Sequence, residues 1–163
     1  MHGDGTKLAT TTHNATPARL LDLTRTLRRA GRMATGVDRV ELAYLERFLD
    51  DDAPCFALLR TGLGYLLLDR SGMHALQDRI AGHASWGSPD VLTRIMRNRS
   101  LTSQQAEADM RRYAIARCTP WGLHRLLAKL TAETVYYNVG HSNLTARVLS
   151  ALRRKSIQIN VLI

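Results

Sequence analysis

Thr134-Val-Tyr-Tyr-Asn-Val139 opens the stretch of sequence that decides the fold of this chain. Its β-branched and aromatic residues favour a strand. The next residues, Gly140-His-Ser-Asn143, predict a tight turn that ends in residue types common at the start of a helix. A helix is predicted next, because apolar residues recur on one face at Leu144, Val148, Leu149 and Leu152. Ile157–Ile163 then predicts a second strand.

A strand, a helix and a second strand at this spacing predict a βαβ unit in a parallel sheet. Ile157–Ile163 is apolar on both faces apart from Gln158 and Asn160. Because strands of that kind belong inside a covered sheet, we expect the sheet to continue beyond this strand and the domain to be incomplete at its C-terminus. The alternative is a short domain that ends on an edge strand.

The N-terminal part of the chain predicts the same kind of fold. Leu20–Thr24 is a short apolar strand, and Thr35 can cap a helix in which Asp38 closes a capping box. Asp50–Asp52 and Pro54 end that helix. Its apolar face is predicted to contain Val37, Val40, Tyr44, Leu45, Phe48 and Leu49.

The middle of the chain predicts a hairpin and then mainly helices. Two apolar strands, Cys55–Arg60 and Tyr65–Asp69, flank a turn with two glycines. A helix over Met73–Ile80 follows, and residues 86–130 are expected to be a helical insertion. Its helices are Asp90–Met96, Thr102–Cys118 and Trp121–Leu130. The predicted fold class is therefore α/β, with a Rossmann-like parallel sheet and flanking helices.

Length and composition indicate a single globular domain over residues 19–163. The chain has 163 residues, of which 45% are hydrophobic, and contains no apolar run long enough to cross a membrane. Residues 1–18 are polar, lack a secretory signal, and are expected to form a disordered lead-in. Because Cys55 and Cys118 do not suggest a disulfide framework, we expect a reducing, cytoplasmic compartment.

The net charge of +9 comes almost entirely from arginine. The arginines stand in pairs and triplets with acidic runs between them, a pattern typical of solvated helix faces. An attraction to phosphate-bearing ligands or to an anionic membrane surface is the other interpretation.

The common cofactor motifs are absent from the sequence. It contains no Gly-x-Gly-x-x-Gly and no P-loop, and its histidines and cysteines lack the spacing of metal ligands. We therefore expect no cofactor and no metal.

Two glycine-containing turns are the candidate binding sites. Gly140, His141 and Asn143 lie at the carboxyl end of a predicted parallel strand, where α/β proteins bind ligands. Gly36 and Arg39 follow the first strand in the same way, and Arg39 could hold a phosphate or carboxylate. The alternative for both turns is an ordinary capping turn without a ligand.

Four stretches resemble the N-terminal half of a bacterial group 1 glycosyltransferase. They are Arg19-Leu-Leu-Asp-Leu-Thr-Arg25, Thr35-Gly-Val-Asp-Arg-Val-Glu-Leu-Ala-Tyr-Leu45, Leu59-Arg-Thr-Gly-Leu-Gly-Tyr-Leu-Leu-Leu-Asp-Arg70 and Tyr137-Asn-Val-Gly-His-Ser-Asn-Leu144. The resemblance implies a GT-B fold, in which two Rossmann-like domains enclose a cleft. It also implies that Gly36, Arg39 and the Gly140–Asn143 turn face that cleft.

The resemblance implies the acceptor-side domain of an enzyme of polysaccharide biosynthesis that moves a sugar from a nucleotide-sugar donor to a glycan acceptor. Family members follow a strand like Ile157–Ile163 with a His-Asp pair and a second domain, which this chain lacks, so the fragment alone is expected to be inactive. An anionic membrane surface is a further expected partner, while specific nucleic-acid binding is not expected. The rival hypothesis is a non-enzymatic basic α/β module that binds nucleic acid or a protein.

Overall fold

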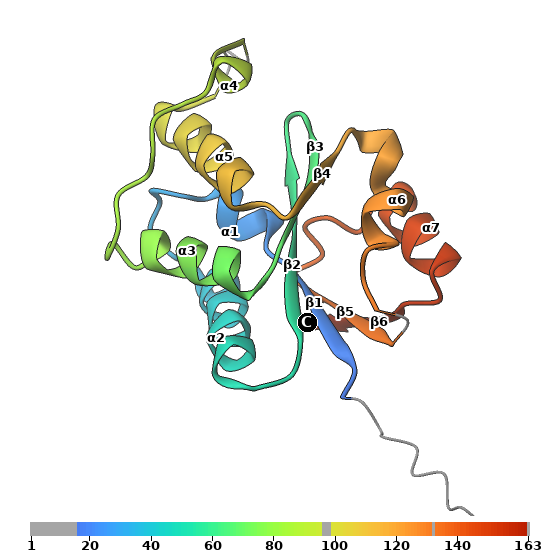
Figure 1. The fold of residues 1–163 in the computed structure, drawn as a ribbon. Helices are drawn as coiled ribbons and strands as arrows, with labels where there is room; N and C mark the ends of the chain where they lie inside the picture. Colours follow the sequence, from blue (N-terminus) through green and yellow to red (C-terminus); the bar gives the residue numbers. More distant parts are fainter. Residues whose placement is uncertain (1–15, 96–98, 132, 163) are drawn as a thin grey trace, which may run out of the picture.

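A six-stranded mixed sheet forms the middle layer of the protein, with helices on both sides (Figure 1). The computed structural model describes residues 16–95, 99–131 and 133–162. The strands are β1 (Ala18–Asp22), β2 (Cys55–Thr61), β3 (Gly64–Leu68), β4 (Ala116–Cys118), β5 (Thr134–Val139) and β6 (Gln158–Leu162). They lie in the order β4-β3-β2-β1-β5-β6.

Strands β2, β1, β5 and β6 run parallel, while β3 and β4 add to the sheet antiparallel to their neighbours. The predicted hairpin of β2 and β3 and the predicted βαβ unit of β5 and β6 are both confirmed. The helix of that unit is α7 (Ala146–Arg154). The protein thus has an α/β fold with a mixed, largely parallel sheet.

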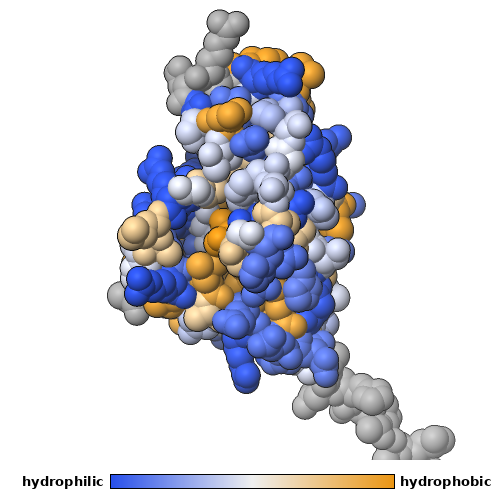
Figure 2. Space-filling view, turned by 90° about the vertical axis from the view of Figure 1, so that its left-hand side faces the viewer, coloured by the Kyte–Doolittle hydropathy of each residue, from blue (hydrophilic) through white to orange (hydrophobic). Residues whose placement is uncertain are grey.

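The helices divide into two layers, each with its own apolar core (Figure 1). One layer contains α1 (Thr24–Arg28), α2 (Gly36–Asp50), α3 (Arg70–Ile80) and α5 (Leu101–Tyr113). The other contains α6 (Leu123–Leu127) and α7. Figure 2 views the first layer from outside, where hydrophilic residues dominate and apolar ones are scattered between them. No helix in the described parts of the chain has the length and apolarity that a membrane crossing requires.

Helix α2 begins and ends as predicted, but its buried face differs from the expected one. The capping box of Thr35 and Asp38 is present. Val37 and Val40, expected in the core, are 40% and 46% exposed, whereas Asp38 and Glu41 are buried. The apolar pattern was misleading here because two acidic residues have buried partners on neighbouring segments.

The predicted helix over Thr102–Cys118 is wrong at its carboxyl end. Helix α5 stops at Tyr113, and β4 follows within the segment 86–130 that was expected to be helical. β4 forms because it pairs with the open backbone edge of β3, which would otherwise lack hydrogen-bond partners. The remaining helical elements here are α4 (Val91–Ile95) and the 3-10 turn η1 (Pro120–Gly122) before α6.

The interpretation of Ile157–Ile163 as an interior strand, buried on both faces, is wrong for the residues that the structure describes. β6 pairs only with β5 among them, and none of its five residues is buried. Ile157, just before β6, is buried against the α6–α7 layer. An apolar sequence indicates that a strand packs against something, but it does not indicate how many strands lie beside it. Residues 1–15 of the predicted lead-in over residues 1–18 lie outside the described residues, as do Met96 and Ile163. The last residue of that lead-in, Ala18, is instead buried and begins β1.

Replacing Gly64 with alanine is expected to lower the free energy of unfolding by roughly 3 kcal/mol. Gly64 has a φ of +138°, and an added Cβ would lie 2.0 Å from the carbonyl oxygen of Cys118 in β4. Urea unfolding followed by circular dichroism measures the loss. Gly36→Ala is the control, because an added Cβ there meets nothing within 4 Å. Equal stability of the two variants would contradict the β3–β4 pairing.

Candidate functional site

The candidate site lies where the strand order reverses, at the carboxyl ends of β1 and β5. These two strands are parallel neighbours. The chain leaves β1 toward β2 on one side of the sheet and leaves β5 toward β6 on the other. Because the connections diverge, loops leave room for a ligand at such a point in open α/β sheets.

A buried carboxylate, that of Asp22, joins the two strands at this point. Asp22 is the last residue of β1 and is 1% exposed. Its Oδ1 accepts a hydrogen bond from the backbone N–H of Thr24 at 3.0 Å. Its Oδ2 accepts from the Tyr136 hydroxyl at 2.6 Å and from Asn143 Nδ2 at 2.8 Å. The Tyr136 oxygen in turn accepts from Asn138 Nδ2 at 3.0 Å.

The direction of the Tyr136 hydrogen bond is fixed by its protonation state. Burial, and then the nearby charge of Asp22, raise the pKa of the Tyr136 phenol well above its usual value. The hydroxyl therefore remains protonated and donates to the carboxylate. The amide nitrogens of Asn138 and Asn143 both donate hydrogen bonds within this network, which holds each amide group in one orientation.

Several polar atoms around this network have no hydrogen-bond partner among the described residues. They are Asn138 Oδ1, Asn143 Oδ1, Ser142 Oγ and Glu41 Oε1. A buried polar group without a partner is costly and rare in folded proteins. The two amide oxygens can only accept, so they match a ligand that donates hydrogen bonds, such as a hydroxyl group.

Glu41 of α2 is a second buried carboxyl group beside Asp22. It is 0% exposed, and its Oε2 accepts from the backbone N–H and the hydroxyl of Thr26. Burial, with a smaller contribution from the charge of Asp22, raises the pKa of Glu41 to about 8. At neutral pH the Glu41 carboxyl is mostly protonated and can donate a hydrogen bond.

Asp38, one helical turn before Glu41, has the opposite electrostatics. Its carboxylate receives the Nε–H groups of Arg25 and Arg29 at 2.7 Å each, and it also closes the α2 capping box with Thr35. Burial alone would raise its pKa, but the hydrogen bonds from Thr35 and the two arginines outweigh it and hold the pKa at about 2. These two ion pairs fix the chain between α1 and α2.

Positive charge gathers next to Asp22. Burial lowers the pKa of Arg28 at the end of α1, and Arg60 and Arg99 lower it further by repulsion. Arg99 is paired with Glu107 of α5. The side chains of Arg28 and Arg60 make no hydrogen bond or ion pair within the part of the chain that the structure describes. An anion bound between them would relieve their repulsion.

The structure brings the residues of the predicted Gly140–Asn143 site to this point. Asn143 is 1% exposed and is a member of the Asp22 network. Gly140 and His141 have φ values of +71° and +57°, so the loop turns sharply just after β5. The His141 side chain is exposed and takes no part in the network.

The other predicted pair, Gly36 and Arg39, lies in the first turn of α2. Both residues are exposed. Val37, between them, packs so closely on Gly140 that an added Cβ at Gly140 would lie 2.6 Å from Val37 Cγ1. The two predicted turns are therefore neighbours, although Val37 and Gly140 are 103 positions apart in the sequence.

Sequence reasoning missed Asp22, Glu41, Tyr136 and Asn138 as members of the site. Two signals were present. Asp22 is a charged residue at the end of an apolar run. Asn138 is two residues after Tyr136, so both side chains lie on the same face of the strand. Glu41 gave no such signal, because it is one of several acidic residues on a helix that carries charged and apolar side chains.

Comparison with protein-family models, curated proteins and solved structures found no match for this chain. Within residues 16–95, 99–131 and 133–162, no three His, Cys, Asp or Glu side chains come together as metal ligands.

Tyr136→Phe is expected to destabilise the fold by about 1–3 kcal/mol, because Asp22 loses one donor and Asn138 Nδ2 loses its acceptor. Denaturant unfolding monitored by circular dichroism gives the change. Tyr137→Phe is the matched control in the same strand. The phenylalanine keeps the edge-to-face contact with Phe48, so its effect should stay within about 0.5 kcal/mol. Similar losses in both variants would show that the Asp22 network adds nothing specific.

Glu41→Gln is expected to remove part of the pH dependence of stability. Since the folded-state pKa of Glu41 is raised to about 8, its contribution is fully present below the ordinary glutamate pKa and is lost as the pH rises through 8. Between the ordinary glutamate pKa and pH 8, the free energy of unfolding of the wild type should fall by about 1.4 kcal/mol per pH unit relative to the variant. Urea unfolding between pH 5 and 9 measures it. Glu46→Gln, exposed on the same helix, should follow the wild type; a pH-independent difference for Glu41→Gln refutes the raised pKa.

Proposed function

We propose that this chain is the acceptor-side domain of a GT-B glycosyltransferase and binds a hydroxyl-rich glycan at the carboxyl ends of β1 and β5. The observation that carries the proposal is the set of buried oxygens left without partners around Asp22, among the described residues. Sugar hydroxyls are the donors that such oxygens lack. The resemblance of four stretches of the sequence to group 1 glycosyltransferases supports the same class of ligand.

The Asp22 network would orient the glycan rather than react with it. Asp22 and Tyr136 hold the amide nitrogens of Asn143 and Asn138, so the two amide oxygens are fixed before a ligand arrives. Preorganised acceptors of this kind lose little conformational entropy on binding and hold a hydroxyl in a defined direction. The protonated Glu41 carboxyl could donate to an oxygen of the same ligand.

The arginines next to Asp22 suit the phosphate groups of a nucleotide-sugar donor. Arg60 is close enough to Arg28 to lower the pKa of Arg28 by charge repulsion, so a diphosphate held between the two side chains would be stabilised. Arg39 and His141 are exposed beside the two neighbouring turns and are proposed as further contacts to the acceptor or the donor phosphate. The chemistry of transfer itself is not assigned to any residue of this chain.

The distribution of ion pairs weakens the rival hypothesis of a basic nucleic-acid-binding module. Many arginines are paired with carboxylates within the described residues and contribute little free charge to a surface. They are Arg19, Arg25, Arg29, Arg79, Arg99, Arg111 and Arg112. A nucleic-acid interface needs unpaired basic side chains gathered along one face.

Ligand-observed NMR tests the proposal with the chain as it stands. We expect saturation transfer to short oligosaccharides and to UDP-glucose, and Arg39→Gln should weaken at least one of these by about tenfold through the loss of a charge-assisted hydrogen bond. Arg47→Gln, near the other end of the same helix, is the matched control and should bind like the wild type.

Generic duplex DNA is tested alongside the saccharides as a rival ligand. If neither saccharides nor UDP-glucose bind, or if Arg39→Gln and Arg47→Gln behave alike, the proposed ligand or the proposed contact is wrong. Tight binding of generic duplex DNA with a steep dependence on salt would instead favour the nucleic-acid module.

A further inference from the structure

A second candidate site lies at the opposite border of the sheet from β6, between the β2–β3 turn, β4 and α4. The pocket there has a volume of about 320 Å³. That size is within the usual range for small-molecule sites. Its residues do not overlap with the Asp22 network, so this inference does not depend on the proposed function.

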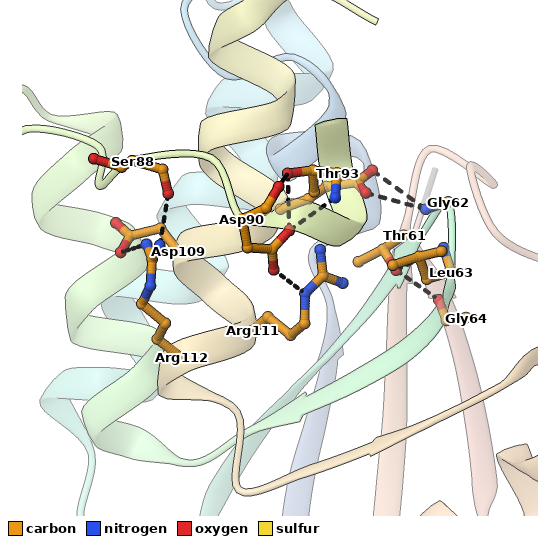
Figure 3. A network of polar contacts seen from close by, with 11 residues as sticks. Thr61, Gly62, Leu63, Gly64, Ser88, Asp90, Thr93, Asp109, Arg111 and Arg112 are labelled. Atoms are coloured by element: carbon orange, nitrogen blue, oxygen red, sulfur yellow. Dashed lines mark hydrogen bonds and ion pairs between the residues drawn. The ribbon is translucent and has the colours of Figure 1, made fainter. Parts of the chain in front are cut away.

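The buried charge at this pocket is Arg111 of α5. Arg111 lines the pocket and is 8% exposed. Its Nε–H donates to Asp90 Oδ2 at 2.8 Å, but its Nη2 has no hydrogen-bond partner among the described residues. Figure 3 shows the guanidinium between Asp90 on one side and the Thr61–Gly64 turn on the other. A buried guanidinium with a spare N–H group is suited to a further acceptor.

The carboxylate of Asp90 receives donors from Thr93 and from Arg111 Nε, and none of these bonds involves Arg111 Nη2. Its Oδ1 already accepts from the backbone N–H and the hydroxyl of Thr93, both at 2.8 Å. Burial alone would raise the pKa of Asp90, but the hydrogen bonds from Arg111 and Thr93 outweigh it and hold the pKa at about 2. Asp90 is therefore a charged partner that positions Arg111 through Nε, while Nη2 has no partner among the described residues.

Arg112, the next residue along α5, has no such spare group facing the pocket. It points away from Arg111, toward Asp109 and Ser88 (Figure 3). Its Nη2 donates to the carbonyl oxygen of Ser88 at 2.6 Å, and its Nη1 lies 3.5 Å from Asp109 Oδ1. The contrast shows that the free donor at Arg111 is a local feature of the pocket and not a general property of arginines on this helix.

The rest of the pocket wall combines a second cation with apolar surface. Arg117 of β4 lines the pocket, is exposed, and has no ion pair within the described residues. Leu63, Leu66 and Leu92 form apolar wall, and Leu92 is 48% exposed. Two arginines beside apolar side chains fit a ligand with an anionic end and an apolar body.

We propose that this pocket binds a small amphipathic anion, whose carboxylate or phosphate is held by Arg111 and Arg117 and whose apolar body lies on Leu63, Leu66 and Leu92. Planar guanidinium groups pair with either kind of oxyanion. Removing the apolar body from water adds affinity that a bare anion would not gain.

Isothermal titration calorimetry on the whole chain tests this with four probes: phenyl phosphate, phenylacetate, inorganic phosphate and benzyl alcohol. At least one of the two amphipathic anions should bind about tenfold or more tightly than inorganic phosphate and benzyl alcohol. The comparison of phenyl phosphate with phenylacetate identifies which anionic group the pocket prefers.

Arg111→Gln should weaken that binding by about tenfold or more, and Arg112→Gln, its matched control, by less than about twofold. Because Arg111→Gln leaves Asp90 unpaired and could unfold the protein, Leu92→Glu provides a second comparison. It places a like charge at the exposed rim and should also weaken binding by about tenfold, whereas Val91→Glu, on the same helix and 72% exposed, should not.

Three results would overturn the proposal. The first is that no probe binds, and the second is that benzyl alcohol or inorganic phosphate binds as tightly as the amphipathic anions. The third is that the folded variants Leu92→Glu and Val91→Glu, or Arg111→Gln and Arg112→Gln, show equal affinities. In each case Arg111 would serve only as the structural partner of Asp90.

Discussion

The carboxylate of Asp22 is the group on which the central part of the structure depends. It is buried at the end of β1 and is kept in place by donors from three segments, the Thr24 backbone, Tyr136 of β5 and Asn143 of the following loop. A buried charge is tolerated only when hydrogen bonds replace its hydration. The same bonds that satisfy Asp22 also fix the loop after β5, so the stability of the sheet and the geometry of the candidate site are determined by one set of contacts.

The sequence was informative wherever local signals agree with the tertiary structure. The βαβ unit of β5, α7 and β6 was predictable because strand composition, turn residues and helical periodicity all favour it. The start of α2 was predictable from its capping box. β4 was not, because a three-residue strand has no periodic pattern and forms only by pairing with β3.

The candidate site was predictable only in part, for a physical reason. Gly140, Asn143 and Gly36 were identified from their positions after strands, which is a local property. Asp22, Glu41 and Asn138 belong to the site through contacts with segments far away in the sequence, and their burial depends on partners that a linear pattern does not reveal. The sequence predicted β6 as an interior strand, although it lies at the border of the described sheet. The number of strands beside it depends on the whole fold and not on its own residues.

The long separation between the partners of Asp22 has a consequence for how the site comes into existence. Tyr136 and Asn143 are 114 and 121 residues away from Asp22 along the chain. Contacts this distant close large loops and are slow to form, so Asp22 remains without these two partners until the chain has been synthesised beyond Asn143. A ligand held by this network would bind only chains in which β1 has paired with β5 and the loop after it. By mass action, such a ligand would stabilise the folded state.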